Sequence, residues 1–221
     1  MSVAAYDEIA DWYEREFLSA QAGADPVGVH AALDEMLGAG SGICLEVGCG
    51  TGTHAAQLRR LGWTPVGMDL SAGMLRHARG RLPIARADVT RLPVRDASVP
   101  AVVAVMVHTD IPGYPAVLRE AARVLRPGGV LVHVGVHPCF CGGFADRTDP
   151  SAIVIRPGYR DGHWTKESWT TAGVRAKVGA SHWPLTGLFG MFRDAGLTPV
   201  AFHEGGDGPT PTTFSVRLTS S

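Results

Sequence analysis

Residues 43–54 read Ile43-Cys44-Leu45-Glu46-Val47-Gly48-Cys49-Gly50-Thr51-Gly52-Thr53-His54, and this stretch decides the fold of the chain. Its first five residues are mostly strand formers with one acidic interruption, the pattern of a strand covered by helices on both faces. The three glycines permit positive φ angles and let backbone N–H groups come close to a ligand. Helix formers from Ala55 to Leu61 follow. The stretch therefore predicts a buried strand, a tight turn and a helix.

The spacing of the glycines indicates which ligand this turn suits. A glycine turn between a strand and a helix binds nucleotide-type ligands at the edge of an open α/β sheet. A pyrophosphate cradle needs Gly-x-Gly-x-x-Gly, but Thr53 stands where its third glycine should fall. Glu46 would repel a pyrophosphate and attract the cationic amino group and sulfonium of S-adenosylmethionine. A tight turn without any ligand is the alternative.

The segment from Leu45 to Gly52 closely resembles the first motif of the class I S-adenosylmethionine-dependent methyltransferases of the small-molecule type. The resemblance is strong from Ile43 to His137 and moderate at both ends. It implies an α/β fold, a Rossmann-like three-layer sandwich around a seven-stranded, mostly parallel sheet with strand order 3-2-1-4-5-7-6 and an antiparallel last strand. It also implies S-adenosyl-L-methionine as the cofactor and S-adenosyl-L-homocysteine as the product.

Two further acidic residues follow predicted strands. Asp69 ends the strand Thr64 to Asp69, where a carboxylate can accept both ribose hydroxyls of an adenosine. The tripeptide Asp69-Leu70-Ser71 also resembles the second motif of the family. In the family, an acid and an apolar residue after the third strand bind the adenine, and Asp88 with Val89 matches that pair. The match is imperfect, because the run from Pro100 to Val103 lacks the aspartate that commonly opens the fourth strand.

The N-terminal pattern Tyr-Asp-x-Ile-Ala-x-x-Tyr, from Tyr6 to Tyr13, looks like the segment that folds over the cofactor in many small-molecule methyltransferases. We expect an amphipathic helix from Tyr6 to Leu18 and a helical lid over about residues 1–40. Simple packing of Tyr6 and Phe17 on the core is an equal alternative. The full set of cofactor-binding residues that the resemblance implies is Tyr13, Glu46, Gly48, Gly50, Gly52, His54, Asp69, Leu70, Met74, Asp88, Val89 and Met106.

Composition limits the class of protein. The chain has 221 residues, is 45% hydrophobic and 19% charged, and predicts a single domain over residues 1–221. Its formal net charge of −1 gives no overall basic field, so we expect no nucleic acid and no membrane as partner. The four cysteines do not resemble a disulfide framework, and residues 1–10 do not resemble a secretory signal. We expect a cytoplasmic monomer or homodimer.

The remaining elements follow from hydrophobic periodicity. We expect helices at Val29–Leu37, Ala72–Arg79, Tyr114–Leu125 and Pro184–Ala195. Further strands are expected at Leu82–Val89, Ala101–Val107 and Val130–Val136, with a terminal hairpin at Thr198–His203 and Thr212–Leu218. Between about 138 and 183 the periodic signal fades, and we interpret this segment as a substrate-binding insert. Its rings can wall a small organic acceptor or simply pack the insert, and they are Phe140, Phe144, Tyr159, His163, Trp164, Trp169, His182 and Trp183.

Catalytic candidates lie at the ends of predicted strands. His108 and His137 end adjacent strands on the expected cofactor side, and imidazole titrates near neutrality, so either can act as a general base. For His108, a supporting role without proton transfer is an equal alternative. The expected substrate-contacting residues are Tyr6, His108, Asp110, His137, Phe140, Tyr159 and His182. No trio of acids is arranged for a divalent ion, although Asp110 prevents a firm exclusion, and we predict no metal.

The sequence as a whole predicts methyl transfer from S-adenosylmethionine to an N, O or C atom of a small-molecule acceptor, in secondary metabolism. DNA base methylation is not expected, because His108-Thr109-Asp110-Ile111 stands where the nucleic-acid enzymes carry an Asn/Asp-Pro-Pro-Tyr/Phe tetrapeptide. Two alternatives stay open. One is methylation of a protein or a tRNA, and the other is a protein that binds S-adenosylmethionine without transferring its methyl group.

Overall fold

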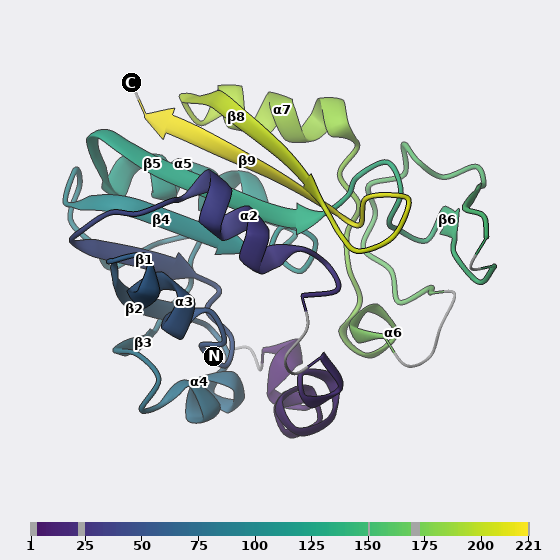
Figure 1. Cartoon of the computed structure of the whole chain (residues 1–221), viewed down its shortest axis with the longest axis horizontal. Helices are drawn as coiled ribbons and strands as arrows, with labels where there is room; N and C mark the ends of the chain where they lie inside the picture. Colours follow the sequence, from purple (N-terminus) through teal and green to yellow (C-terminus); the bar gives the residue numbers. More distant parts are fainter. Residues whose placement is uncertain (1–3, 22–24, 150, 169–172, 221) are drawn as a thin grey trace.

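A computed structural model describes residues 4–21, 25–149, 151–168 and 173–220 of the chain. The parts of the predicted lid at 1–3 and 22–24, and Trp169 of the predicted insert, lie outside these residues. The centre of the fold is a seven-stranded sheet with the order β3-β2-β1-β4-β5-β9-β8 (Figure 1). Its strands are β1 (Ile43–Val47), β2 (Thr64–Asp69), β3 (Ile84–Arg86), β4 (Val99–Val105), β5 (Leu125–Val136), β8 (Leu197–Gly205) and β9 (Thr213–Ser220).

The pairing of these strands confirms the predicted fold class. Strands β1 to β5 pair in parallel, whereas β9 runs antiparallel to both of its neighbours, β5 and β8. In the sequence order of the strands, this is the predicted arrangement 3-2-1-4-5-7-6. The carboxyl ends of the parallel strands meet at one edge, and ligands of open α/β sheets bind at that edge.

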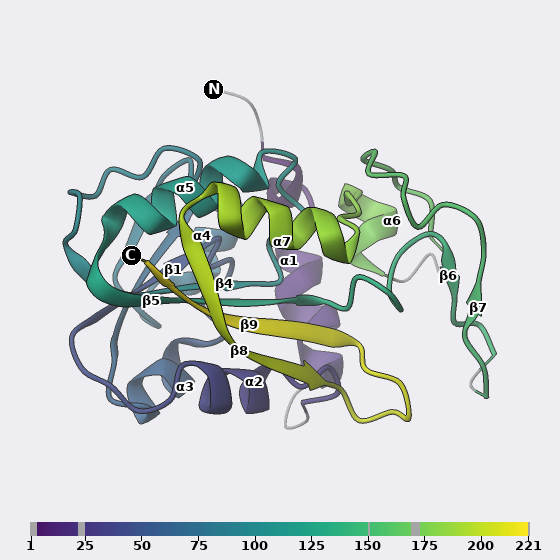
Figure 2. The same ribbon diagram turned by 90° about the horizontal axis from the view of Figure 1, so that it is seen from above.

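Helices cover both faces of the sheet (Figure 2). On one face lie α2 (Val29–Met36) and α3 (Ala55–Arg60), and on the other lie α5 (Tyr114–Val124) and α7 (Leu185–Asp194). Helix α4 (Ala72–Ala78) follows β2 and packs through Leu75 and Ala78 against Leu82. The result is the predicted three-layer arrangement.

The core explains why the strands are apolar on both sides. Along β4, Val102 and Ala104 pack in the cluster that holds α5 and α7, while Val103 and Val105 pack in the cluster that holds α2. Alternate residues of a strand point to opposite faces, so a strand buried on both faces carries an unbroken apolar run. The run from 99 to 105 is therefore a central strand.

The N-terminal segment differs from the single helix predicted over Tyr6–Leu18. A 3-10 turn, η1 (Ala5–Asp7), is followed by α1 (Ala10–Trp12), which continues directly into the π-helix η2 (Tyr13–Phe17), and then by a second 3-10 turn, η3 (Ser19–Gln21), so the predicted helix is present only from Ala10 to Phe17. Ile9 has φ −110° and ψ 2°, which interrupts the helix. The cause is tertiary, because Asp7 bonds to Ser71 and to Gly73 at the start of α4 and so fixes the first turn apart from the rest.

Several element bounds also differ from the predicted ones. The predicted strand over Leu82–Val89 contains only the three residues of β3, because Asp88 turns back to bond Thr90. Strand β5 begins five residues before the predicted start at Val130, because Leu125 already pairs with Val99. Within the insert, the structure adds a small hairpin of β6 (Ala145–Asp146) and β7 (Val154–Ile155) and the helix α6 (Val174–Val178).

Figure 1 shows where the segments outside the sandwich lie. The N-terminal turns, drawn in purple, and α6 of the insert lie beyond the carboxyl ends of the parallel strands. They contact one another, since the ammonium of Lys177 lies 4.3 Å from the ring centroid of Trp12. None of the helices in the described part of the chain is long and apolar enough to cross a membrane.

Candidate active site

The turn after β1 depends on its glycines. Gly48, Gly50 and Gly52 have φ angles of 68°, 53° and 74°, which L side chains rarely adopt. A Cβ on Gly48 would lie 2.3 Å from Val107 Cγ1, and one on Gly52 would lie 2.5 Å from Leu82 Cδ2. These two glycines allow the turn to pack closely against its neighbours. Gly50 is less crowded, and its N–H donates to Asp69 Oδ2 at 2.8 Å, which ties the turn to the end of β2.

Glu46 is a buried acid at the carboxyl end of β1, with 1% of its surface exposed. Its Oε1 lies 2.8 Å from His54 Nδ1, and the residue thereby links β1 to the residue before α3. Its Oε2 is buried and has no hydrogen-bond partner among the described residues. A buried carboxylate oxygen without a partner is costly, so its position favours a cationic or N–H-bearing ligand beside it.

Asp69 stands beside Glu46 at the end of the next strand. Its Oδ1 accepts from the Ser71 N–H at 2.8 Å, and its Oδ2 accepts from Gly50. Burial raises the pKa of Asp69 and the charge of Glu46 adds to this rise, whereas the N–H donors of Ser71 and Gly50 lower it. Each carboxylate oxygen can accept a further hydrogen bond, so the capacity to bind two hydroxyl groups is present.

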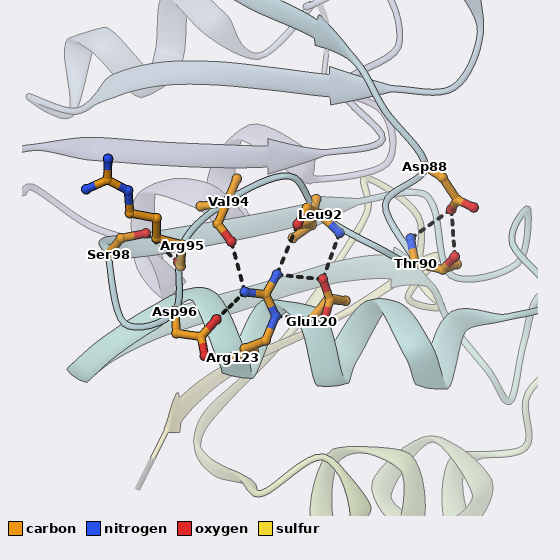
Figure 3. A network of polar contacts seen from close by, with 9 residues as sticks. All are labelled: Asp88, Thr90, Leu92, Val94, Arg95, Asp96, Ser98, Glu120 and Arg123. Carbon is orange, nitrogen blue, oxygen red and sulfur yellow. Dashed lines mark hydrogen bonds and ion pairs between the residues drawn. The ribbon is translucent and has the colours of Figure 1, made fainter.

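Asp88 lies on an exposed loop after β3, and Figure 3 shows how that loop is held. Its Oδ1 accepts from the N–H and the hydroxyl of Thr90, at 2.9 and 2.7 Å. Further along, Arg123 of α5 donates to the carbonyls of Leu92 and Val94 at 3.0 and 2.8 Å. The same guanidinium pairs with Glu120 and Asp96, and these acids raise its pKa. Helix α5 therefore fixes the shape of the loop that begins at Asp88.

The other residues of the implied cofactor set lie around the same edge. Met106 follows β4 with φ 56°, a conformation uncommon outside glycine, and its N–H donates to Val134 O at 2.7 Å. Met74 is buried behind the turn near Gly50, Val89 is buried in the main core, and Leu70 is exposed. The strained backbone at Met106 marks the end of β4 as a place where the fold enforces an unusual geometry.

The N-terminal segment is attached to α4 through several polar contacts. Asp7 Oδ1 accepts from the Ser71 hydroxyl at 2.6 Å and from the Gly73 N–H at 2.8 Å, and both bonds lower the pKa of Asp7. Asp11 contacts Arg76 and His77 at 2.7 and 2.8 Å. Glu14 pairs with Arg81. The segment thus lies across the start of α4, next to the end of β2.

Two tyrosines of this segment reach the carboxylates of the site. The Tyr6 hydroxyl donates to Asp110 Oδ2 at 2.6 Å, and the rings of Tyr6 and Tyr13 meet edge to face with centroids 6.0 Å apart. Burial raises the pKa of Tyr13 to about 12, and the charges of Asp110 and Asp69 add to it. The tyrosines therefore lie where the charges of both aspartates act. Burial also raises the pKa of Asp110 to about 6.

His108 is buried behind the end of β4, with 2% of its surface exposed. Its ring lies against Gly135, where a Cβ would come within 2.4 Å of His108 Cε1, and its centroid is 4.9 Å from that of His133. Its Nδ1 has no partner among the described residues. Burial lowers the pKa of His108 well below its usual range, and the neighbouring His133, His182 and Arg175 lower it further. The ring is therefore neutral.

His137 belongs to a different cluster, at the end of β5. Its Nδ1 accepts from the Cys139 N–H at 3.1 Å, and its Nε2 contacts Glu204 Oε1 at 2.7 Å. Its ring packs on Phe140 and Phe214, with centroids 4.6 and 5.7 Å away. Both ring nitrogens are engaged, which leaves no lone pair for a substrate proton. In this arrangement His137 and Phe140 hold the start of the insert against β8 and β9.

The insert supplies an aromatic group near β4. The rings of Phe144, Tyr159 and His182 pack together, with centroids 4.7 to 5.4 Å apart. The segment is attached to the end of β4, because Ser181 N donates to Thr109 O at 2.7 Å and Trp183 Nε1 donates to His108 O at 2.9 Å. His163 and Trp164 are exposed. By contrast, Phe144 and His182 are buried, and Tyr159 and Trp183 are partly buried.

One charged residue near the site was missed by the sequence analysis. Arg175 of α6 is partly buried, and its charge lowers the pKa values of His108, His182 and Asp110. No periodic pattern marks it, because it lies in the insert. The only available signal was a basic residue amid glycine, proline and aromatic residues. Among the described residues, no group of three or more His, Cys, Asp or Glu side chains could hold a metal ion. The predicted absence of a metal stays a prediction.

The family of the chain follows from comparison with known proteins. Residues 45–133, which contain the glycine turn, both following acids and β4, match the family described as "Methyltransferase domain". This match, together with the relatives below, supports a class I S-adenosylmethionine-dependent methyltransferase. In this methyltransferase, the matched segment contains Glu46, Asp69, Asp88 and Asp110, the acids at the carboxyl edge of the sheet.

Individual relatives agree with this family. A demethylmenaquinone methyltransferase of Beutenbergia cavernae is 36% identical over 131 residues, which are 58% of this chain and 54% of the relative. A Mycolicibacterium smegmatis protein named "Probable S-adenosylmethionine-dependent methyltransferase" is 27% identical over 168 residues, 73% of this chain and 60% of that protein. The methyltransferase thus matches little more than half the length of these curated relatives.

The fold is shared with solved structures. An S-adenosylmethionine-dependent methyltransferase from Mesorhizobium loti superposes with a TM-score of 0.71 at 18% identity, over 89% of this chain and 98% of that chain. At this identity, the likeness concerns the fold alone.

Proposed function

We propose that this methyltransferase binds S-adenosylmethionine at the glycine turn and transfers its methyl group to a small-molecule acceptor. The observation that carries the proposal is Glu46 Oε2, a buried carboxylate oxygen without a partner at the end of β1. A cationic amino group is the chemistry that satisfies it. The glycine turn itself is open at Gly50, since a Cβ there would meet only Met74 Cε, at 3.4 Å.

Each end of the cofactor has residues of this chain suited to it. Glu46 would hold the amino group, Asp69 the ribose hydroxyls, and Asp88 with Val89 the adenine. Asp69 is supported by its two N–H donors, which orient its carboxylate toward the turn. The role of Asp88 rests on the family motif and on its exposed carboxylate beside the loop that Arg123 fixes.

When bound, S-adenosylmethionine supplies a methyl group on a positively charged sulfur. The chain has to align an acceptor with it, exclude water and remove a proton where the acceptor is an alcohol, phenol or amine. Tyr6 and Tyr13 would exclude water, because the Tyr6 hydroxyl bonds Asp110 and the charges of Asp110 and Asp69 both act on Tyr13. Asp110 takes the proton, since a carboxyl group with a pKa of about 6 is largely ionised at neutral pH and still accepts a proton readily.

Asp110 suits this role better than either histidine candidate. The ring nitrogens of His137 are both engaged, and the pKa of His108 is far below neutrality. Asp110 instead bonds Tyr6, a residue of the segment that covers the site. We therefore propose His108 as a supporting residue beneath the acceptor, and Asp110 with Tyr6 as the pair that contacts it.

The test of the cofactor site is calorimetric titration with S-adenosylmethionine. Glu46→Gln removes the charge and keeps the shape, and we expect its affinity to fall about 10- to 100-fold, since a charged hydrogen-bond partner contributes about 1.5–3 kcal/mol. Glu16→Gln, at an exposed position of the N-terminal segment, is the matched control and should bind like wild type. Equal affinities for wild type and Glu46→Gln would refute the assignment.

The acceptor is a separate question. The name of the Beutenbergia cavernae relative gives demethylmenaquinone as the acceptor of that protein. We propose a small molecule here too, with secondary metabolism as its setting and a cytoplasmic monomer or homodimer as its state. All four cysteines are free thiols, which supports a reducing compartment. Incubation of the pure protein with labelled S-adenosylmethionine and a metabolite extract tests this, because labelled product distinguishes an enzyme from a protein that only binds the cofactor.

A further inference from the structure

Arg175 is a partly buried cation without an acidic partner among the described residues. Its guanidinium donates from Nη1 to the carbonyl of Ala180, at 3.1 Å. Burial lowers its pKa, whereas the charges of Asp110 and Cys141 raise it. No carboxylate of the described residues lies within ion-pair distance of it. A guanidinium has five N–H donors, so most of its binding capacity is unused.

Comparison with Arg123 shows that holding the fold is not the main use of Arg175. Arg123 has a structural role: it donates to two carbonyls and pairs with two acids. Arg175 spends one donor on the backbone of its own segment. Burying a cation without a paired anion lowers the stability of the fold, so we infer that Arg175 has a role in binding a ligand.

The surroundings of Arg175 contain further polar groups without partners. His108 Nδ1 and His182 Nε2 are buried and have no hydrogen-bond partner in the described part of the chain, and the exposed fractions of these residues are 2% and 7%. The charge of Arg175 lowers the pKa of both rings, so both are near it and both are neutral. A neutral imidazole can donate or accept one hydrogen bond at such a nitrogen. One cation and two imidazoles therefore surround the same region, next to Asp110.

We propose that Arg175 binds a carboxylate group of the acceptor, and that the methyltransferase therefore acts on an aromatic acid. The planar fork of a guanidinium matches a carboxylate with two parallel hydrogen bonds. The rings of His182, Phe144 and Tyr159 pack together, and they would contact the flat ring of the acid. Bound in this way, the acid directs its nucleophilic atom toward Asp110 and the end of β4.

This proposal rests on the proposed function, and the experiment separates the two. Calorimetry on protein saturated with S-adenosylhomocysteine measures the binding of benzoate, phenylacetate, 4-hydroxybenzoate and indole-3-acetate, each against its primary amide. We expect at least one acid to bind at least about 10-fold more tightly than its amide. In Arg175→Gln this preference should disappear, and in Arg175→Lys it should be partly kept, because the charge remains without the fork.

The controls decide how each result is read. Lys166→Gln removes an exposed cation of the same insert and should keep the preference. The affinity for S-adenosylhomocysteine should be unchanged in all variants, which also shows that they are folded. If wild type binds no acid, or binds acids and amides equally, the carboxylate site is refuted. If wild type fails to bind S-adenosylhomocysteine, the proposed function fails first.

Discussion

At the residue scale, Asp110 shows how one side chain can be tuned by its surroundings. Burial is the main cause of its raised pKa, and Asp69 raises it further, while the bonds from Tyr6 and Thr109 and the charge of Arg175 lower it. The folded protein thus favours the protonated form more than the unfolded chain does, in which the ordinary value is 3.8. At neutral pH the ionised Asp110 is a cost to stability.

This cost predicts the effect of Asp110→Asn on stability. The contribution of a group with a raised folded pKa is fully present below pH 3.8 and is lost as the pH rises through about 6. At pH 7.5 we expect Asp110→Asn, which still accepts from Tyr6, to be about 1–2 kcal/mol more stable than wild type. The difference should vanish near pH 4. Thermal unfolding at both pH values measures it, and a variant less stable at pH 7.5 would contradict the raised pKa.

The sequence identified single residues well where a motif fixes them. Glu46 and Asp69 lie at the ends of β1 and β2, and the glycines form the turn after β1, as expected. These features depend on a few neighbouring residues, so the local sequence is enough to predict them. The contacts of His137 could not be predicted, since Glu204 lies 67 residues away in sequence. The burial of His108 depends on Gly135 and His133 of another strand, which the local sequence does not show.

At the scale of elements, α5 determines the shape of the loop after β3. Arg123 joins that helix to Leu92, Val94 and Asp96, and Glu120 of the same helix accepts from the Leu92 N–H at 2.7 Å (Figure 3). This loop begins at Asp88, which we propose to contact the adenine. The shape of the proposed adenine-binding loop therefore depends on α5, mainly through the guanidinium of Arg123.

We predict that Arg123→Met lowers both the stability and the cofactor affinity. Two carbonyls lose their charged donor, and two acids lose their partner, at about 1–3 kcal/mol of unfolding free energy. The affinity for S-adenosylhomocysteine should fall severalfold, because the loop from Asp88 is no longer fixed. Arg119→Met, at an exposed position of the same helix, is the control. Denaturant unfolding and calorimetry measure the two effects, and a variant that matches this control in both would show that the loop holds its shape without Arg123.

Elements with an unbroken apolar pattern were predicted closely, and those shaped by distant contacts were not. Helix α5 was expected at Tyr114–Leu125 and is found at Tyr114–Val124. Its apolar residues recur at helical spacing, and the same residues are the ones buried in the core. The N-terminal helix instead breaks where Asp7 bonds to α4. The order in the insert depends on bridges such as Thr165 with Ala180, which no local pattern predicts.

At the scale of the whole molecule, buried histidines make the fold sensitive to acid. Burial lowers the pKa of His133 to about 3, and its Nδ1 lies 2.7 Å from the Tyr114 hydroxyl. A histidine with a lowered folded pKa contributes stability above the unfolded value of 6.5, which is lost as the pH falls toward 3. His108 and His182 act in the same direction.

The double variant His133→Leu with Tyr114→Phe tests this. We expect wild type to lose unfolding free energy steeply between pH 6.5 and pH 4, with a contribution of about 1.4 kcal/mol per pH unit from each buried histidine. The double variant should lose one such contribution, since both polar partners become apolar together. His163→Gln, at an exposed histidine, should keep the slope of wild type. Parallel curves for wild type and the double variant would refute the prediction.

The attachment of residues 4–17 has a consequence for the timing of turnover. Asp7 is bonded to the start of α4 and Tyr6 to Asp110, so the segment is attached on both sides of the proposed cofactor site. We expect the product S-adenosylhomocysteine to leave only after the bonds of Asp7 and Tyr6 have broken. Release of S-adenosylhomocysteine, and not methyl transfer, would then limit the turnover rate. We expect that rate to fall as the viscosity of the solvent rises.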